Sequence, residues 1–194
     1  MASLPQLRIN PAEYVALEQK LGVKHEYHDG QMFAMAGGSL AHSRLQVTLA
    51  RRVDEGLSDG PCSAYSADVR VVIDAARMAT YPDLSIVYGP AQGAKEFRHS
   101  ITNPTVLIEV LSPSTERYDR GVKFDQYRKL ESLREYVLVS QHEMAIDLFR
   151  LENGQWIFYP LRGEDAVLSL TSAGIEIPLR GIYRNVPFED AEQA

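Results

Sequence analysis

Two carboxylates in strand-like surroundings and one lysine on the helix that follows are the residues of this chain best suited to chemistry. Asp83 follows a proline at the start of the segment YPDLSIVYG, and Glu109 lies inside the apolar run TVLIEVL. A carboxylate among apolar neighbours loses hydration, so an unpaired one is costly or becomes protonated. If the two segments pair as antiparallel strands, the start of one meets the end of the other, and Asp83 approaches Glu109.

Two carboxylates in one half-buried place repel each other unless a cation lies between them. A hard divalent ion with oxygen ligands, Mg²⁺ or Mn²⁺, resolves this conflict. Lys123 is four residues from both Asp119 and Tyr127, so these three side chains share one helix face. A lysine beside carboxylates and a metal can orient water or stabilise charge on phosphate oxygens. The combination suits the hydrolysis of a phosphodiester bond.

Structural explanations of the same residues stay open at this point. Glu109 and Lys123 could form an ion pair that serves only the fold. Asp83 could be a simple strand-start residue, and Asp119 could do no more than begin the helix. A zinc site is a weaker alternative: His25 and His28 bracket Glu26 and His42 opens the second helix, but the spacing is weak and no third ligand of matching type is evident.

The apolar pattern predicts a mixed scaffold, α/β or α+β, for these side chains. We expect helices over residues 9–21, 41–57 and 118–132, and strands over residues 68–74, 83–89, 105–111 and 135–140. The strand over 105–111 is apolar on both faces, which is typical of a central position in a sheet. Tight turns are expected at Asp29-Gly30 and at Asn153-Gly154, the second inside a hairpin over residues 145–161.

The composition is that of a globular protein, with 45% apolar and 24% charged residues. The 194 residues fit one domain over 1–194. The formal net charge of −6 argues against a non-specific nucleic-acid coat protein, though not against a local basic surface. The single cysteine, Cys62, suits a reducing compartment. Without a signal-peptide pattern or an apolar run of roughly 20 residues, we expect a cytoplasmic protein with no membrane contact.

Two surfaces could meet partners. Residues 117–134 hold six basic and three acidic side chains, so this helix could contact a phosphate backbone, or it could be a solvated face of mixed charge. The aromatic segment WIFY in the hairpin and the apolar tail suggest a surface for self-association, so we expect a homodimer.

The segments YPDLSIVYG, PTVLIEVLSPSTERYDRGVKFDQYRKL and SLREYVLVS resemble the Uma2 family, a group within the PD-(D/E)XK nuclease superfamily. The resemblance extends from KHEYHDG to LRGIYRNV. It implies a restriction-endonuclease-like mixed central sheet flanked by helices, with an additional C-terminal β-hairpin. The implied function is that of a metal-dependent endonuclease that hydrolyses DNA. The alternative is a catalytically inactive protein that keeps the fold as a nucleic-acid-binding or assembly module.

The resemblance also implies roles for individual residues. Asp83 matches the aspartate of the first motif and Glu109 the acidic residue of the second, both as metal ligands in the catalytic centre. The superfamily pattern would place a lysine at position 111, which is Leu111 here, and Lys123 on the next helix takes its place. The resemblance adds a metal-binding backbone carbonyl from Val110 and a further acidic ligand, Glu26. Asp68 is a less supported neighbour of the site.

Overall fold

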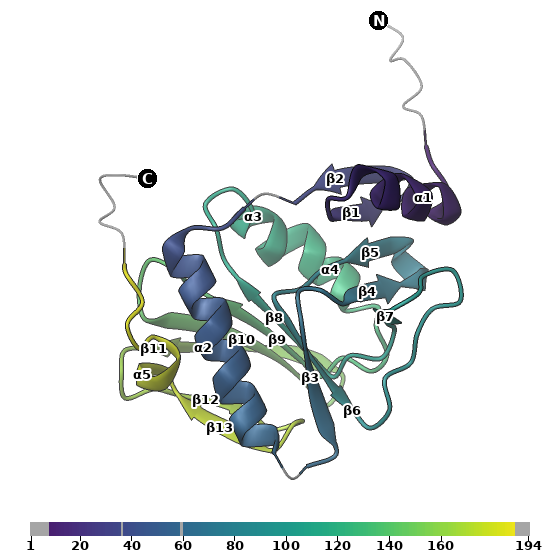
Figure 1. Ribbon diagram of the computed structural model, residues 1–194. Helices are drawn as coiled ribbons and strands as arrows, with labels where there is room; N and C mark the ends of the chain where they lie inside the picture. Colours follow the sequence, from purple (N-terminus) through teal and green to yellow (C-terminus); the bar gives the residue numbers. More distant parts are fainter. Residues whose placement is uncertain (1–7, 36, 59, 189–194) are drawn as a thin grey trace, which may run out of the picture.

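Two mixed β-sheets and a few helices make up the fold (Figure 1). The structure is a computed structural model that describes residues 8–35, 37–58 and 60–188. The larger sheet has six strands in the order β11-β10-β9-β8-β6-β3, and the smaller has five in the order β2-β1-β5-β4-β7. Each sheet combines antiparallel pairs with one parallel pair. The predicted α+β class with a mixed sheet is therefore confirmed.

The elements divide between the two sheets and the layers that cover them. The six-stranded sheet contains β3 (Cys62–Ser66), β6 (Leu84–Tyr88), β8 (Val106–Val110), β9 (Glu135–Val139), β10 (Ala145–Glu152) and β11 (Gln155–Arg162). The five-stranded sheet contains β1 (His25–His28), β2 (Gln31–Ala34), β4 (Arg70–Ile73), β5 (Met78–Thr80) and β7 (Ser100–Ile101). The remaining elements are α1 (Pro11–Leu21), α2 (Leu40–Leu57), η1 (Asp74–Ala76), α3 (Glu116–Tyr118), η2 (Asp119–Lys123), α4 (Phe124–Tyr127), β12 (Val167–Leu170), β13 (Ile175–Pro178) and α5 (Leu179–Ile182).

The pairing of β6 with β8 sets the geometry on which the candidate chemistry depends. The two strands are antiparallel with Leu84 opposite Ile108, so the residue before Leu84 lies beside the residue after Ile108. The predicted approach of the start of one strand to the end of the other is confirmed. Alternation sends Val106, Ile108 and Val110 towards the core beneath α2, and Leu107 towards the opposite face.

Helix α2 lies across one face of the six-stranded sheet (Figure 1). Its buried stripe of Leu45, Leu49 and Val53 repeats at helical spacing and packs into the core that also contains β12, β13 and α5. The opposite face of the sheet is covered by the helical stretch 116–127 and by part of the five-stranded sheet. Glu109 therefore faces that helical stretch, on the same side as Leu107.

The predicted helix over 118–132 differs from the helical stretch that forms. That stretch begins at Glu116, ends at Tyr127 and includes a five-residue π-helical turn from Asp119 to Lys123. After it the chain continues in tight turns, with Leu130 N–H donating to the Tyr127 carbonyl. Burial of Leu130 and Leu133 in the core stabilises these turns relative to a continued helix. Strands β3, β5 and β7 were not predicted either.

Two hairpins complete the C-terminal half. β10 and β11 join at the predicted tight turn, Asn153-Gly154, whose φ angles of 49° and 81° are both positive, as in a type I′ turn. The additional C-terminal β-hairpin is also present, as β12 paired with β13. Of the aromatic segment in β11, Trp156 packs against Phe124 and only Phe158 is strongly exposed. In the described part of the chain, no helix has the length and hydropathy needed to span a bilayer.

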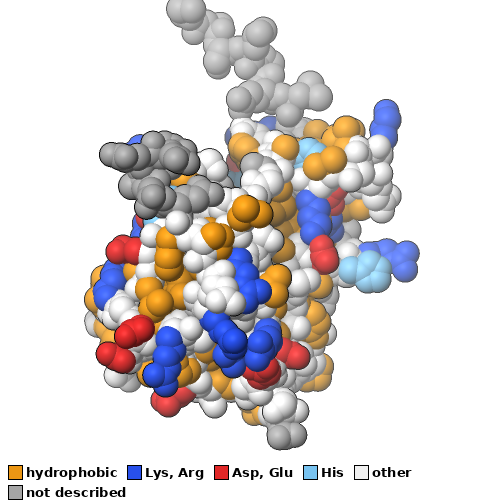
Figure 2. Space-filling model, turned by 60° about the vertical axis from the view of Figure 1, so that its left-hand side comes forward, with side chains coloured by type: hydrophobic (Ala, Val, Ile, Leu, Met, Phe, Trp, Pro, Cys, Tyr) orange, Lys and Arg blue, Asp and Glu red, His pale blue; other side chains and the backbone are white. Residues whose placement is uncertain are grey.

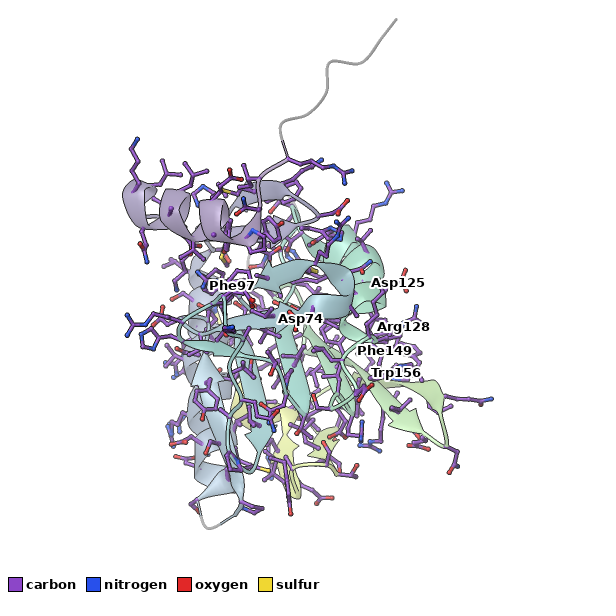
Figure 3. All side chains as sticks on the ribbon, turned by 90° about the vertical axis from the view of Figure 1, so that its right-hand side faces the viewer. Asp74, Phe97, Asp125, Arg128, Phe149 and Trp156 are labelled. Carbon is purple, nitrogen blue, oxygen red and sulfur yellow. The ribbon has the colours of Figure 1, made fainter. Side chains whose placement is uncertain are left out.

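An aromatic cluster fixes the position of α4. The ring of Phe124 lies 4.6 Å from that of Phe149 and 5.2 Å from that of Trp156, centroid to centroid, and the Arg128 guanidinium stands 5.2 Å from its centre. Figure 3 shows Arg128, Phe149 and Trp156 together beside the β10–β11 hairpin. Because Phe124 directly follows Lys123, this packing holds the lysine at a defined place over the sheet.

A buried ion pair attaches α1 to the five-stranded sheet. The guanidinium of Arg70, on β4, pairs with Glu18 of α1 and donates a hydrogen bond of 2.6 Å to the Tyr81 hydroxyl. It also stands 5.3 Å from the ring centre of Tyr14 and 5.5 Å from that of Phe97. Arg70 is only 8% exposed, so its charge depends on these partners.

We expect Arg70→Met to lower the free energy of unfolding by about 3–5 kcal/mol, because it leaves the Glu18 carboxylate without its buried partner. Urea unfolding measures this loss. Arg51→Met is the matched control, since Arg51 pairs with Glu55 on the exposed side of α2 and should cost far less. Equal losses in the two variants would contradict a stabilising role for the buried pair.

Candidate active site

One cavity of about 680 Å³ collects acidic side chains from four separate segments of the chain. Glu26 comes from β1, Asp83 from the residue before β6, Glu109 from β8 and Asp119 from η2. Lys123 lines the same cavity. The structure thus brings the three predicted catalytic residues, Asp83, Glu109 and Lys123, to one place.

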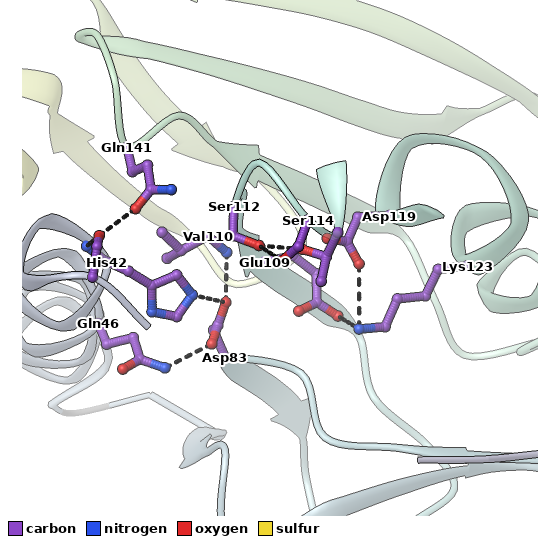
Figure 4. Close-up of polar contacts among 12 residues, drawn as sticks. His42, Gln46, Asp83, Glu109, Val110, Ser112, Ser114, Asp119, Lys123 and Gln141 are labelled. Carbon is purple, nitrogen blue, oxygen red and sulfur yellow. Dashed lines mark hydrogen bonds and ion pairs between the residues drawn. The ribbon is translucent and has the colours of Figure 1, made fainter. Parts of the chain in front are cut away.

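Hydrogen bonds occupy both oxygens of Asp83 (Figure 4). Oδ2 accepts from the backbone N–H of Val110 at 2.6 Å, and Oδ1 accepts from Gln46 Nε2 at 2.7 Å. His42 Nε2 lies 3.6 Å from Oδ2. Burial alone would raise the pKa of Asp83, but His42, the Val110 N–H and Gln46 together lower it. The carboxylate is therefore held in its ionised form.

His42 takes part in the contacts around Asp83. Burial alone would lower the pKa of its imidazole, but the hydrogen bond and the charge of Asp83, together with the backbone of Val110, raise it above the ordinary value. His42 stands near the start of α2, and Gln46 follows it by one helical turn, so α2 delivers both side chains to Asp83.

The pKa of Glu109 is shifted in the opposite direction to that of Asp83. Its side chain is nearly fully buried, and Oε1 lies 2.9 Å from Lys123 Nζ and 2.7 Å from the donating hydroxyl of Tyr127. Burial raises the pKa of Glu109 to about 8, the charges of Asp119 and Asp83 add to this shift, and Lys123 opposes it. Glu109 therefore carries a proton more readily than an ordinary glutamate.

Lys123 is buried among three carboxylates. Its Nζ lies 2.9 Å from Glu109, 3.0 Å from Glu26 and 3.4 Å from Asp119. Burial alone would lower the pKa of the ammonium, but these three carboxylates raise it well above its ordinary value. The π-helical turn carries both Asp119 and Lys123, which confirms that the two share one side of the helix.

Glu26 lies against the lysine. Its Oε1 contacts Lys123 Nζ and accepts a hydrogen bond from the Thr80 hydroxyl of β5. Its role as a metal ligand stays a prediction. Asp68 is not among the residues that line the cavity; it pairs with Lys24 on the exposed surface.

No ready-made metal cluster is present: across residues 8–35, 37–58 and 60–188, no three His, Cys, Asp or Glu side chains are grouped to hold an ion. The weak zinc alternative gains no support, since the His25 ring instead hydrogen-bonds the Val23 carbonyl. The predicted set of Glu26, Asp83 and Glu109 is not preassembled either, because Lys123 pairs with both glutamates.

The donors at the cavity nevertheless fit a hard divalent ion. Mg²⁺ keeps several waters and is usually bound by one or two carboxylates and substrate phosphates. Asp83 and Glu109, which line the cavity, would supply such carboxylates, and Val110, next to Glu109 in the lining, would supply a backbone oxygen. Burial raises the pKa of Glu109 and the charges of Asp119 and Asp83 add to this shift, so a cation bound beside Glu109 would favour its ionised form.

Several partners in the site were missed from the sequence. Gln46 had one usable signal, its spacing of four residues from His42 on the polar side of the α2 stripe. Tyr127 had its predicted place on the helix face of Lys123, although its hydrogen bond to Glu109 was not foreseen. Thr80 had no signal, because its contact depends on how β5 meets β1. Side-chain pairs between elements far apart in sequence are not encoded in local periodicity.

The fold and the cavity define a protein of the restriction-endonuclease-like class. The fold is similar to a crystal structure from Anabaena variabilis described as "a putative nuclease belonging to DUF820", with a TM-score of 0.66 over 86% of this chain and 96% of that chain, at 17% identity. A family model, Uma2, described as "Putative restriction endonuclease", matches residues 11–180. The chain belongs to the Uma2 family, as its motifs predicted.

Two relatives come from Synechocystis sp. One, "Uncharacterized protein slr1290", is 37% identical over 187 residues, which is 96% of this chain and 97% of the relative. The other, "Uncharacterized protein sll1609", is 28% identical and covers 84% of this chain and 93% of its own length.

We expect Glu109 to make the metal-free protein less stable as the pH rises. The pKa of Glu109 is about 8 in the folded protein, against an ordinary value of 4.5. Between pH 4.5 and about pH 8 the folded state therefore holds the Glu109 proton more tightly than the unfolded state does, so the free energy of unfolding falls as the pH rises through this range. The melting temperature of the wild type minus that of Glu109→Gln should therefore decrease from about pH 5 to about pH 9 in EDTA. A difference that stays constant with pH would contradict the assignment.

Proposed function

We propose that this protein is a metal-dependent endonuclease that hydrolyses phosphodiester bonds in DNA. The observation that carries the proposal is the convergence of Asp83, Glu109 and Lys123 from three separate elements on one cavity. Membership of a family described as restriction endonucleases supports the nuclease class, and such enzymes generally use divalent metals. Mg²⁺ or Mn²⁺ as the ion and DNA as the substrate are the finer parts of the proposal.

Each residue has a distinct task in this chemistry. Asp83 and Glu109, with the carbonyl of Val110, would hold the cation, which supplies charge neutralisation for the phosphate oxygens when bound. Gln46 and the Val110 N–H keep the Asp83 carboxylate ionised and fixed in orientation. Lys123 stays protonated among its carboxylates and can orient the attacking water or stabilise negative charge that develops on the phosphate.

A non-catalytic role is the second candidate, a nuclease-fold protein that binds nucleic acid or assembles with partners. One observation favours it: Asp83 accepts hydrogen bonds from protein donors on both oxygens and Glu109 accepts one on Oε1, and no three-ligand cluster exists in the described residues. The expected homodimer is part of the proposal, and it rests on Phe158, which is 49% exposed on the edge strand β11.

We expect Mg²⁺- or Mn²⁺-dependent nicking of plasmid DNA that EDTA abolishes. Asp83→Ala and Lys123→Ala should each lower the nicking rate by about 100-fold or more, because each removes a group that acts on the reacting phosphate. Asp68→Ala is the matched control, since Asp68 is exposed and outside the cavity lining.

Cleavage that persists in both Asp83→Ala and Lys123→Ala would point to a contaminant and contradict the hydrolytic centre. DNA binding by the wild type without cleavage in either ion would favour the non-catalytic candidate.

Exposed arginines offer a surface for the DNA backbone on α2 and α5. Figure 2 shows Lys and Arg side chains gathered low on the face that this view brings forward. This basic surface consists of exposed Arg51, Arg180 and Arg184 with half-buried Arg44 and Arg52, of which Arg51 and Arg52 pair with Glu55. The Arg44 side chain donates to the Arg184 backbone carbonyl, which ties α2 to the end of α5. Helix α2 also carries His42 and Gln46, so the same element serves the cavity and this surface.

The predicted basic helix has part of its charge neutralised. Arg120 pairs with Glu116 and Asp147, Arg128 pairs with Asp125, and Lys123 is buried. Three of its six cations are thus already paired with neighbouring carboxylates, in line with the alternative of a mixed-charge face.

We expect Arg51→Gln combined with Arg184→Gln to weaken DNA binding and to reduce the slope of log K against log salt by about two, since each phosphate contact contributes about 0.9. Fluorescence anisotropy in Ca²⁺ over a range of KCl concentrations measures both quantities. The control, Arg117→Gln with Arg134→Gln, removes the same charge from the predicted basic helix. If only the control variant reduced the slope of log K against log salt, the phosphate contacts would be assigned to the helix over residues 117–134 instead.

A further inference from the structure

The β1–β2 hairpin presents an aromatic ring beside the catalytic lysine. Glu26 and Phe33 are direct cross-strand partners, so their side chains lie on the same face of the hairpin. Glu26 contacts Lys123, and Phe33 lies one strand further out, on the edge strand β2. Both side chains line the cavity, and Phe33 remains 48% exposed. An open aromatic face therefore stands next to the place proposed for the reacting phosphate.

The rest of this wall is apolar as well. Ala34 and Met35 follow Phe33 along the cavity, and Met35 is 36% exposed. Tyr27 and Met32, the intervening residues of the hairpin, pack instead towards Tyr14 and α1, so the hairpin has one side committed to the core and one side open. The open side carries Phe33 without any ring partner among the aromatic pairs of the described chain.

The charges around the cavity limit what can bind there. Its walls hold four carboxylates, those of Glu26, Asp83, Glu109 and Asp119. Lys123 is the one Lys or Arg among the described lining residues, and these carboxylates already surround it. A nucleotide bound in the cavity thus meets no Lys or Arg in the described walls whose charge is not already balanced by a carboxylate. The apolar wall is the part of the cavity that suits its base.

We propose that Phe33, with Met35 beside it, stacks on an unpaired nucleobase next to the scissile phosphate, so that the substrate is bound here as a locally single strand. The inference rests on the proposed nuclease function and names the substrate class of that same site. Inside an intact duplex each base face is covered by its neighbours, whereas an unpaired base offers its face to an aromatic side chain. Base–aromatic stacking tolerates any base, so it adds affinity without sequence specificity.

The test compares single-stranded and duplex oligodeoxynucleotides of the same sequence by fluorescence anisotropy in Ca²⁺. Phe33→Ala should weaken binding of the single strand by about 5- to 150-fold and leave the duplex nearly unchanged. Tyr88→Ala is the matched control, because Tyr88 is 61% exposed on β6, outside the cavity lining, and should change neither affinity. A single strand with abasic sites should bind the wild type about as weakly as the intact strand binds Phe33→Ala.

A second variant keeps the test valid if Phe33→Ala does not fold. Phe33→Trp retains an aromatic plane, so it should bind the single strand as the wild type does, and its added indole fluorescence should be quenched on binding. Tyr88→Trp carries the same added indole at the control position and should show no such quenching.

The outcomes separate this proposal from the nuclease proposal. Phe33-dependent binding of the single strand without cleavage in any divalent ion would support stacking and reject hydrolysis. Metal-dependent plasmid cleavage together with unchanged single-strand affinity in Phe33→Ala would overturn stacking alone. If Phe33→Ala changed only the molar mass by light scattering, Phe33 would belong to a contact between two copies, and stacking would again be overturned.

Discussion

The ammonium of Lys123 among three carboxylates is the interaction on which the rest of the site depends. A buried cation is tolerated only with counter-charge close by, and here that charge comes from β1, from β8 and from the turn that carries the lysine. Glu26 belongs to the smaller sheet and Glu109 to the larger, so one side chain joins the two sheets at the cavity. The ion pairs that neutralise the buried ammonium of Lys123 therefore also hold Glu26 and Glu109 beside it.

The two carboxylates nearest the proposed ion respond to their surroundings in opposite ways. Hydrogen-bond donors and His42 lower the pKa of Asp83, while burial and neighbouring negative charge raise that of Glu109. Environments that separate the pKa values of neighbouring acids are typical of catalytic sites. Asp83 supplies a permanent negative charge, and Glu109 supplies one that depends on the cations around it. The cavity can thus keep its net charge low without an ion and still offer two carboxylates to one.

The central part of the site could be predicted because it follows short-range rules. A proline before Asp83, the alternation around Glu109 and the spacing of four between Asp119 and Lys123 are all visible in the sequence. Gln46 and Thr80 could not be placed, since their contacts depend on packing between elements that are 37 and 54 residues apart along the chain. Two strands of the five-stranded sheet were missed for a related reason: β5 has three residues and β7 two, too few to show a period. The early end of the helix at Tyr127 reflects the burial of Leu130 and Leu133, a tertiary effect that overrides helix propensity.

The attachment of α1 through Arg70 and Glu18 determines how easily the cavity loses one of its walls on heating. Helix α1 and the β1–β2 hairpin pack together around Tyr14 and Tyr27, as a layer distinct from the core beneath α2. Layers of this kind open as cooperative units at a lower free energy than the whole chain. Opening of this layer would withdraw Glu26 from Lys123 while Asp83 and Glu109 stayed in the larger sheet. Thermal inactivation would then be a local event at the N-terminal layer that precedes melting of the six-stranded core.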